Sequence, residues 1–355
     1  MHTRKLRALM AAITAAATFA LLPTSSASNS TVVEEARRAL SDGKETLAIQ
    51  KLEEAAANGN IDAQVELGRM YSAGISVKRD RKRAVTLFEQ AAQQGDGRAQ
   101  WWLGNLYEKG LGVEEDKERA AILYAQAAEQ GIRDAQYDLG QMFLEGDGVE
   151  EDTSKGIKLV EAAAENDLVN AQLLLAESYE KGKYVEQNDT KAAKWYARAA
   201  RLGKVNGFVG LGRILKYGSE DIRNIKDAAS MYEVAAEYGN TEAQQEIADL
   251  YYYGEGVEQD IQKAYSFYRQ AANGGNKKAQ FELGRLYAGG KGVPQSYANA
   301  HMWLNVAAAQ GNERAAELRD EIAAEMTKDQ IAQAQAAASD CASTDYKGCI
   351  RLTGT

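Results

Sequence analysis

The stretch AQWWLGNLYEKGLGVEEDKERAAILYAQAAEQG, residues 99–131, decides the fold because its pattern returns along the chain. Its first residue has a counterpart every 36 residues, and these are Ala63, Ala99, Ala135, Ala171, Gly207, Ala243 and Ala279. A period of this length is typical of stacked two-helix units. We number each repeat from this residue as position 1.

The first part of each repeat predicts a helix. Positions 1, 5 and 9 lie one helical turn apart and form an apolar stripe, in which position 5 is Leu or Ile. Position 12 is Gly in every copy, and a glycine directly after a helix is the expected left-handed cap. These glycines are Gly74, Gly110, Gly146, Gly182, Gly218, Gly254 and Gly290.

The second part of each repeat predicts a second helix. Position 18 always holds a strong N-cap residue, and these are Asp80, Asp116, Asp152, Asn188, Asn224, Asp260 and Ser296. Positions 29 and 30 are Ala in every copy, beside large residues at positions 25 and 26, which predicts close helix–helix contact. Position 6 is only Gly or Ala, so we expect a neighbouring helix to come too close for a larger side chain.

The combined pattern A-x-x-x-L-G-x-x-Y-x-x-G-x-G-V-x-x-D resembles the Sel1-like repeat, a relative of the tetratricopeptide repeat. The resemblance implies an all-α fold, a right-handed α/α solenoid of seven helix-turn-helix repeats between helical caps. The predicted repeats are residues 61–98, 99–134, 135–170, 171–206, 207–242, 243–278 and 279–314. The fifth copy has Glu220 and Asp221 where the others tend to Gly and Val, which predicts a reshaped loop.

Both ends of the repeat array are predicted to be caps. Residues 28–60 fall in the phase of a shortened preceding hairpin. Residues 315–355 form the C-terminal cap, in which Thr327 opens a capping box and a last polar helix runs to about Ala338. The two cysteines, Cys341 and Cys349, are expected to form a disulfide, because a metal site lacks further ligands and a redox site lacks the C-x-x-C spacing.

The N-terminus has the pattern of a signal peptide. Arg4, Lys5 and Arg7 precede an uncharged run, residues 8–22, and small residues follow up to Ala27. We expect residues 1–27 to be removed and the protein to be exported to the periplasm or secreted, with no membrane insertion after cleavage. An uncleaved anchor is the alternative, although the run is shorter than the ~20 residues of a membrane span.

Charge limits the classes of partner. Removal of three basic residues with the signal peptide leaves 39 Lys+Arg against 51 Asp+Glu, a formal net charge of −12. An acidic surface repels phosphate backbones, so nucleic acid is not expected as a partner, and neither is an anionic lipid surface.

The sequence offers little for catalysis. His301 is the only histidine after the signal peptide, and it lies on a predicted helix as a packing residue. Acidic pairs such as Glu114-Glu115 lie in inter-helix loops, where solvated carboxylates are the ordinary interpretation. No nucleophile, metal or phosphate-binding motif is present, so we predict a non-catalytic protein without metal or cofactor.

Aromatic residues at positions expected to be polar are the candidate partner-binding residues. The resemblance implies that the first helix of each repeat lines a concave surface, where Trp102, Tyr217, Tyr252 and Tyr253 would face a partner. Trp101 is expected in the core, because position 3 is usually apolar. The alternative is that these rings pack against adjacent loops.

The resemblance implies protein–protein binding. We therefore expect an exported scaffold or adaptor that binds a protein or peptide on its concave surface, as a periplasmic regulator or assembly factor; a membrane-bound sensor or an envelope complex fits as partner. The alternative is a cell-wall hydrolase or a penicillin-binding activity, with which cysteine-rich Sel1-like proteins have been associated. Those proteins carry cysteine pairs in their repeats, and this chain has none there.

Overall fold

A computed structural model describes residues 30–346 together with Cys349 and Leu352. Within these residues the chain forms eighteen α-helices and no strand, which confirms the all-α prediction. No helix among them is both long and apolar enough to span a membrane. The predicted signal peptide, residues 1–27, lies outside the described residues.

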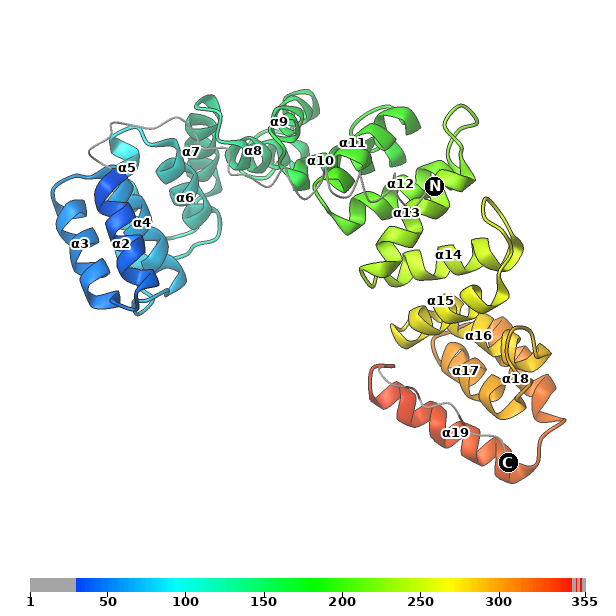
Figure 1. Cartoon of the computed structure of the whole chain (residues 1–355). Coiled ribbons are helices and arrows are strands. Elements are labelled where there is room, and N and C mark those ends of the chain that lie inside the picture. Colours follow the sequence, from blue (N-terminus) through cyan, green and yellow to red (C-terminus); the bar gives the residue numbers. More distant parts are fainter. Residues whose placement is uncertain (1–29, 347–348, 350–351, 353–355) are drawn as a thin grey trace. The chain divides into compact units, whose positions relative to one another are not determined.

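Each repeat is a helical hairpin, and the two helices of a hairpin lie side by side, as α4–α5 and α6–α7 show in Figure 1. The first helices are α4 (Ile61–Ala73), α6 (Gly97–Glu108), α8 (Arg133–Glu145), α10 (Val169–Lys181), α12 (Val205–Tyr217), α14 (Thr241–Tyr253) and α16 (Lys277–Gly289). The second helices are α5 (Arg81–Gln93), α7 (Lys117–Glu129), α9 (Thr153–Glu165), α11 (Asp189–Arg201), α13 (Ile225–Glu237), α15 (Ile261–Asn273) and α17 (Tyr297–Ala309). The capping helices are α2 (Ser30–Ser41), α3 (Glu45–Ala57), α18 (Glu313–Ala323) and α19 (Lys328–Ser343).

The chain divides into two compact units. The first contains the described residues up to Ser178 and Gly182–Glu186, and the second contains Tyr179–Lys181 and the described residues from Gln187 onward. Each unit has its own core of apolar side chains, built around fully buried rings such as Tyr124 in the first and Tyr268 in the second.

The helix ends follow the local signals of the sequence, with one exception. At position 18 of every repeat the side chain accepts a hydrogen bond from the backbone N–H three residues later. The glycine at position 12 is left-handed in six repeats, with φ between 61° and 76°. Gly218 is extended instead, with φ −70° and ψ −172°, so the expectation of a left-handed cap there is wrong. The loop that follows is reshaped as predicted, and Ser219 N–H donates to the Asp189 carboxylate.

A second glycine in the loop brings neighbouring repeats into main-chain contact. Gly112 has φ 84°, and a Cβ added there would lie 2.7 Å from the carbonyl carbon of Arg81 in the preceding repeat. Gly148 and Gly256 approach their preceding repeats in the same way. At these three glycines a side chain would meet the main chain of the preceding repeat. Ser76 and Tyr184 hold the same position in the first and fourth repeats, with the same left-handed backbone.

The small residue at position 6 makes room for a large side chain of the second helix. A Cβ at Gly104 would lie 2.7 Å from Cε1 of Tyr124, whose ring is fully buried. The prediction of a close approach is confirmed, and the group that approaches is the position-26 side chain of the same repeat.

Rings and cations pair within the repeats. In five repeats the position-21 cation lies 4.3 to 5.4 Å from the centroid of the position-9 ring, and the pairs are Arg83–Tyr71, Arg119–Tyr107, Lys155–Phe143, Lys191–Tyr179 and Lys263–Tyr251. In the fifth repeat Leu215 replaces the ring and Asp227 replaces the cation. The seventh repeat keeps the ring, Tyr287, but has Asn299 in place of the cation. Each ring–cation pair is worth about 0.5–1 kcal/mol at exposed sites.

Glutamines at position 2 form hydrogen bonds that link neighbouring helices, a feature not predicted from the sequence. The amides of five of them donate to the carbonyl eight residues earlier, and these are Gln64, Gln136, Gln172, Gln244 and Gln280. Gln100 accepts from Gln130 at 2.8 Å, a link 30 residues long. The dipeptide Ala-Gln, which recurs at positions 1 and 2, is the sequence pattern from which these hydrogen bonds could have been predicted.

The C-terminal cap is longer and less polar than predicted. The capping box of Thr327 is present, but α19 continues to Ser343 instead of ending near Ala338. Its buried residues Ala334, Ala338 and Cys341 form an apolar face, and α19 packs against α17. The predicted disulfide between Cys341 and Cys349 is present.

We predict that Gly112→Ala costs much more stability than Gly95→Ala. Both glycines are left-handed, so each substitution costs about 1 kcal/mol in backbone strain. A Cβ at Gly95 meets open space, whereas one at Gly112 meets the main chain of Arg81 and adds about 2 kcal/mol. Urea unfolding of the two variants measures the difference. Equal losses would show that the loops tolerate a side chain.

Candidate functional site

A groove of about 700 Å³ crosses the first unit, along α2, α4, α6 and the turn before α8. Its apolar lining consists of Val33, Val65, Trp101, Trp102 and Ile132. Its charged lining consists of Glu34, Arg37, Asp62, Glu66, Arg69, Arg98, Arg133 and Asp134. The first helices of successive hairpins supply most of these side chains, so the groove results from the repeat itself.

Trp102 is the centre of the apolar part. Its ring stacks on the buried Phe88 at 6.0 Å between centroids and contacts Trp101 at 4.6 Å. The guanidinium of Arg69 lies 5.9 Å from its centroid. Trp101 is half-buried and also lines the groove, so its placement in the core was wrong. The two indoles therefore offer a supported aromatic surface next to a cation.

Trp101 is oriented by a carboxylate of the next repeat. Its indole N–H donates to Oδ2 of Asp138 at 2.7 Å. Burial raises the pKa of Asp138 to about 6, and the hydrogen bond from Trp101 opposes this rise only in part. Asp138, which is bonded to a residue that lines the groove, is therefore expected to change its protonation state near pH 6.

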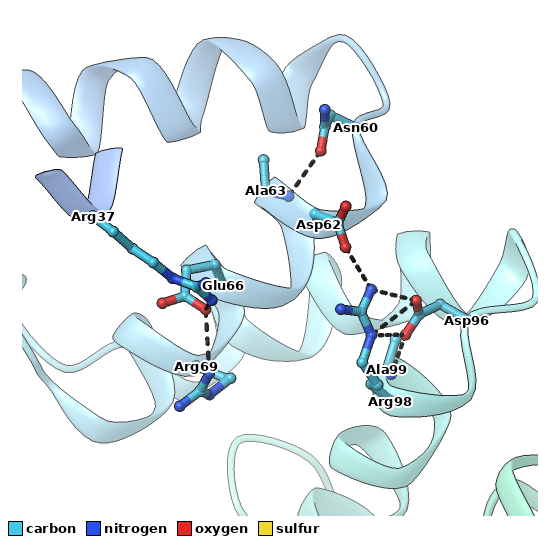
Figure 2. Close-up of polar contacts among 9 residues, drawn as sticks. All are labelled: Arg37, Asn60, Asp62, Ala63, Glu66, Arg69, Asp96, Arg98 and Ala99. Carbon is cyan, nitrogen blue, oxygen red and sulfur yellow. Dashed lines mark hydrogen bonds and ion pairs between the residues drawn. The ribbon is translucent and has the colours of Figure 1, made fainter. Parts of the chain in front are cut away.

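Arg98 is held between two carboxylates, as Figure 2 shows. Its Nη2 lies 2.7 Å from Asp62 and 2.7 Å from Asp96. Asp96 also caps α6 by accepting from Ala99 N–H. Asp62 and Arg98 are 36 residues apart, so this ion pair joins the same position of two adjacent repeats.

Arg37 and Arg69 share one carboxylate. Their guanidinium nitrogens lie 3.3 Å and 3.2 Å from the same oxygen, Oε2 of Glu66 (Figure 2). More than half of the Arg37 side chain is exposed and half of Arg69, whereas Glu66 is only 18% exposed. Two cations thus meet one carboxylate beside Trp102.

The predicted tyrosines lie in the second unit. Tyr217 and Tyr253 are 60% and 57% exposed, so their rings are not packed away under loops. Tyr252 and Tyr253 meet edge to face at 4.9 Å. The hydroxyl of Tyr217 donates to Glu246 at 2.9 Å, and Glu246 also pairs with Lys216. Tyr217 and Tyr253 are therefore exposed rings in the unit that does not contain Trp102, and Tyr252 contacts Tyr253.

The residues weighed for catalysis lie in ordinary structural settings. His301 is buried, and this burial lowers the pKa of its imidazole. Glu114 and Glu115 are exposed in their loop. Among the described residues, no group of His, Cys, Asp and Glu is arranged to hold a metal ion.

The arginines of the groove were not among the site residues predicted from the sequence. Arg37, Arg69 and Arg98 resemble ordinary solvated charges when read one at a time. The available signal was the repeat position, because Asp62, Arg98 and Asp134 alternate in sign at one position that faces the same side.

Comparison with known proteins identifies the repeats. The Sel1 repeat family model matches residues 61–96, 97–132, 133–168, 169–204, 209–240, 241–276 and 277–312. Six of these segments begin at the first residue of the first helix in the repeat. The fifth begins within α12, in the repeat whose loop is reshaped. The prediction of seven Sel1-like repeats is confirmed.

Two solved structures are similar over most of the chain. One is a protective antigen of uropathogenic Escherichia coli strains that displays an SLR fold, with 27% identity, a TM-score of 0.73, and coverage of 92% of this chain and 74% of that one. The other is a Sel1 repeat protein from Oxalobacter formigenes, with 27% identity, a TM-score of 0.62, and coverage of 90% and 91%. The sequence matches none of the curated proteins with which it was compared.

We predict that Asp138→Asn stabilises the protein at pH 7.5 by about 2 kcal/mol and has little effect at pH 4. The folded pKa of about 6 lies above the ordinary value of 3.8, so the folded state holds this proton more tightly, and stability falls as the pH rises from about 4 to about 6. Asn keeps an acceptor for Trp101 and removes the charge. Urea unfolding at the two pH values tests this, and equal effects at both would contradict it.

Proposed function

Because the chain belongs to the Sel1 repeat family, whose members are generally protein–protein interaction scaffolds, we propose that it is a non-catalytic exported scaffold that binds a protein partner. The partner is a polypeptide segment that lies in the groove of the first unit. We place the protein in the periplasm as a regulator or assembly factor of an envelope complex.

The observation that carries this proposal is the supported aromatic surface within a charged groove. Trp102 is half-buried, is backed by Phe88, and is bordered by Arg69. Indole rings that keep one region exposed and are fixed from behind contribute strongly to protein interfaces, since little side-chain entropy is lost on binding. The volume of about 700 Å³ is within the range of sites that hold several side chains of a ligand.

Export is supported first by residues 1–27. The basic residues Arg4, Lys5 and Arg7, the uncharged run and the small residues before Ser28 have the order of a cleavable signal. The disulfide between Cys341 and Cys349 agrees with an oxidising compartment.

Cleavage after Ala27 gives a specific expectation. The protein isolated from the cell envelope should have an intact mass that begins at Ser28. A mass that includes Met1, together with retention in the membrane fraction, would support an uncleaved anchor and overturn periplasmic release.

Site-specific photo-crosslinking tests partner binding. A photoreactive amino acid at Glu34, which lines the groove, should capture a discrete polypeptide in the native envelope. The same residue at Ile122, exposed on α7 but away from the groove, is the matched control and should capture none. Trp102→Ala in the Glu34-labelled protein should remove at least about nine-tenths of the adduct, because loss of a central aromatic hot spot costs ~2 kcal/mol or more, which is more than ten-fold in affinity.

Two results would contradict the groove as the binding site. Equal adducts at both labels would indicate non-specific contact. An adduct that survives Trp102→Ala but disappears with Tyr253→Ala would move the partner to the exposed tyrosines of the second unit.

A further inference from the structure

We propose that the corner of the groove formed by Arg37, Arg69 and Trp102 binds an acidic side chain, Asp or Glu, next to a large apolar side chain of an extended partner segment. This inference rests on the proposed function and specifies the chemistry of its ligand. The shared carboxylate of Glu66 is the feature that leads to it (Figure 2).

Net charge does not select the ligand. Counted together, the lining side chains comprise four arginines and four carboxylates, so the groove as a whole is neutral. Selection must therefore come from how these charges are paired. The chain as a whole is acidic, which would attract a basic segment over long distances, so a basic ligand is the rival to be tested.

The arginines of the groove differ in what they already bind. Arg98 has a carboxylate on each side at 2.7 Å, and Arg133 donates to the backbone carbonyl of Asn166 at 3.0 Å. Among the described residues, Arg37 and Arg69 reach one oxygen between them, at 3.3 and 3.2 Å. A guanidinium has five N–H donors in a fork that matches a carboxylate, so these two retain most of their capacity.

A ligand carboxylate would complete this cluster. With Glu66 it would give two carboxylates for two guanidiniums, each able to form a paired, charge-assisted hydrogen bond. Glu66 is the least exposed of the three side chains, and the guanidinium groups of Arg37 and Arg69 meet at it (Figure 2). All three side chains line the groove, so the cluster is accessible from it.

The neighbouring surface fits an apolar side chain. Arg69 lies above the Trp102 ring, and Val33 and Val65 line the same groove. A ligand residue two positions from the bound carboxylate would reach this surface, because alternate side chains of an extended segment lie on the same face, about 7 Å apart. Recognition would therefore require both side chains together.

A positional-scanning library of acetylated, C-terminally amidated octapeptides tests the proposal on the purified full-length mature protein. Peptides with Asp or Glu two residues from Phe, Leu or Trp should be enriched. Because the peptides are amidated, the bound carboxylate cannot be a C-terminus. A parallel library with free C-termini measures whether a C-terminal carboxylate binds more tightly than a side-chain carboxylate. Enrichment of the free termini alone would overturn the proposal, because it assigns the site to a side chain.

Variants then separate the cluster from the rest of the groove. Combined Arg37→Gln and Arg69→Gln should weaken the best acidic peptide at least ten-fold, and leave its Asn or Gln analogue unchanged. Glu66→Gln should tighten the acidic peptide about three-fold, because it frees both arginines. Lys82→Gln on α5, an exposed cation outside the groove, is the matched control and should have no effect.

The outcomes separate this inference from the proposed function. Peptide binding that prefers Lys or Arg, or that ignores the arginine substitutions while Trp102→Ala abolishes it, would overturn the acidic preference and keep the groove as a binding site. A folded protein that enriches no peptide, and gives no adduct at Glu34 in the envelope, would overturn both.

Discussion

Where the loop carries its second glycine, main-chain contact with the preceding repeat limits the spacing of the repeats. Gly112 lies against the first residue of α5, and no side chain fits between them. The same contact recurs at Gly148 and Gly256 with the start of the second helix in the preceding repeat. Once this distance is fixed, equivalent positions of successive first helices face the same side. Asp62 and Arg98 then pair over one full repeat, and the groove follows from that alignment.

Most of the fold was predictable because the same local signals occur seven times. An N-cap at position 18 and a glycine at position 12 are weak evidence in one copy and strong evidence in seven. Gly218 shows the limit of this reasoning. Its identity agrees with the other copies, but the loop after it lacks the usual Gly-Val, and the backbone takes an extended conformation. The extent of α19 was missed for a related reason, since its small residues look neutral until their packing against α17 is known.

The candidate site was predictable only in part. Trp102 was predicted as a site residue because it is a large ring at a repeat position that is usually polar. Trp101 was placed in the core from its repeat position, and its hydrogen bond to Asp138 instead keeps it at the edge of the groove. The groove arginines do not stand out in the sequence, because they differ only in how many carboxylates each one contacts. Those carboxylates lie about one repeat away along the chain. Which of them an arginine contacts depends on side-chain orientations that the sequence does not predict.

The glutamine links at position 2 have a consequence for how such a chain changes in length. Gln130 reaches Gln100 over 30 residues, and Gln310 reaches Gln280 over the same interval. Loss or duplication of a whole 36-residue segment leaves every one of these intervals unchanged, so each amide meets an equivalent partner in the shortened or lengthened chain. An insertion within one of the two helices shifts the linked glutamines apart and leaves the buried amide oxygen of Gln100 or Gln280 without its donor, at a cost of about 1–3 kcal/mol. Changes by whole repeats therefore preserve these links, whereas shorter changes within a helix break them.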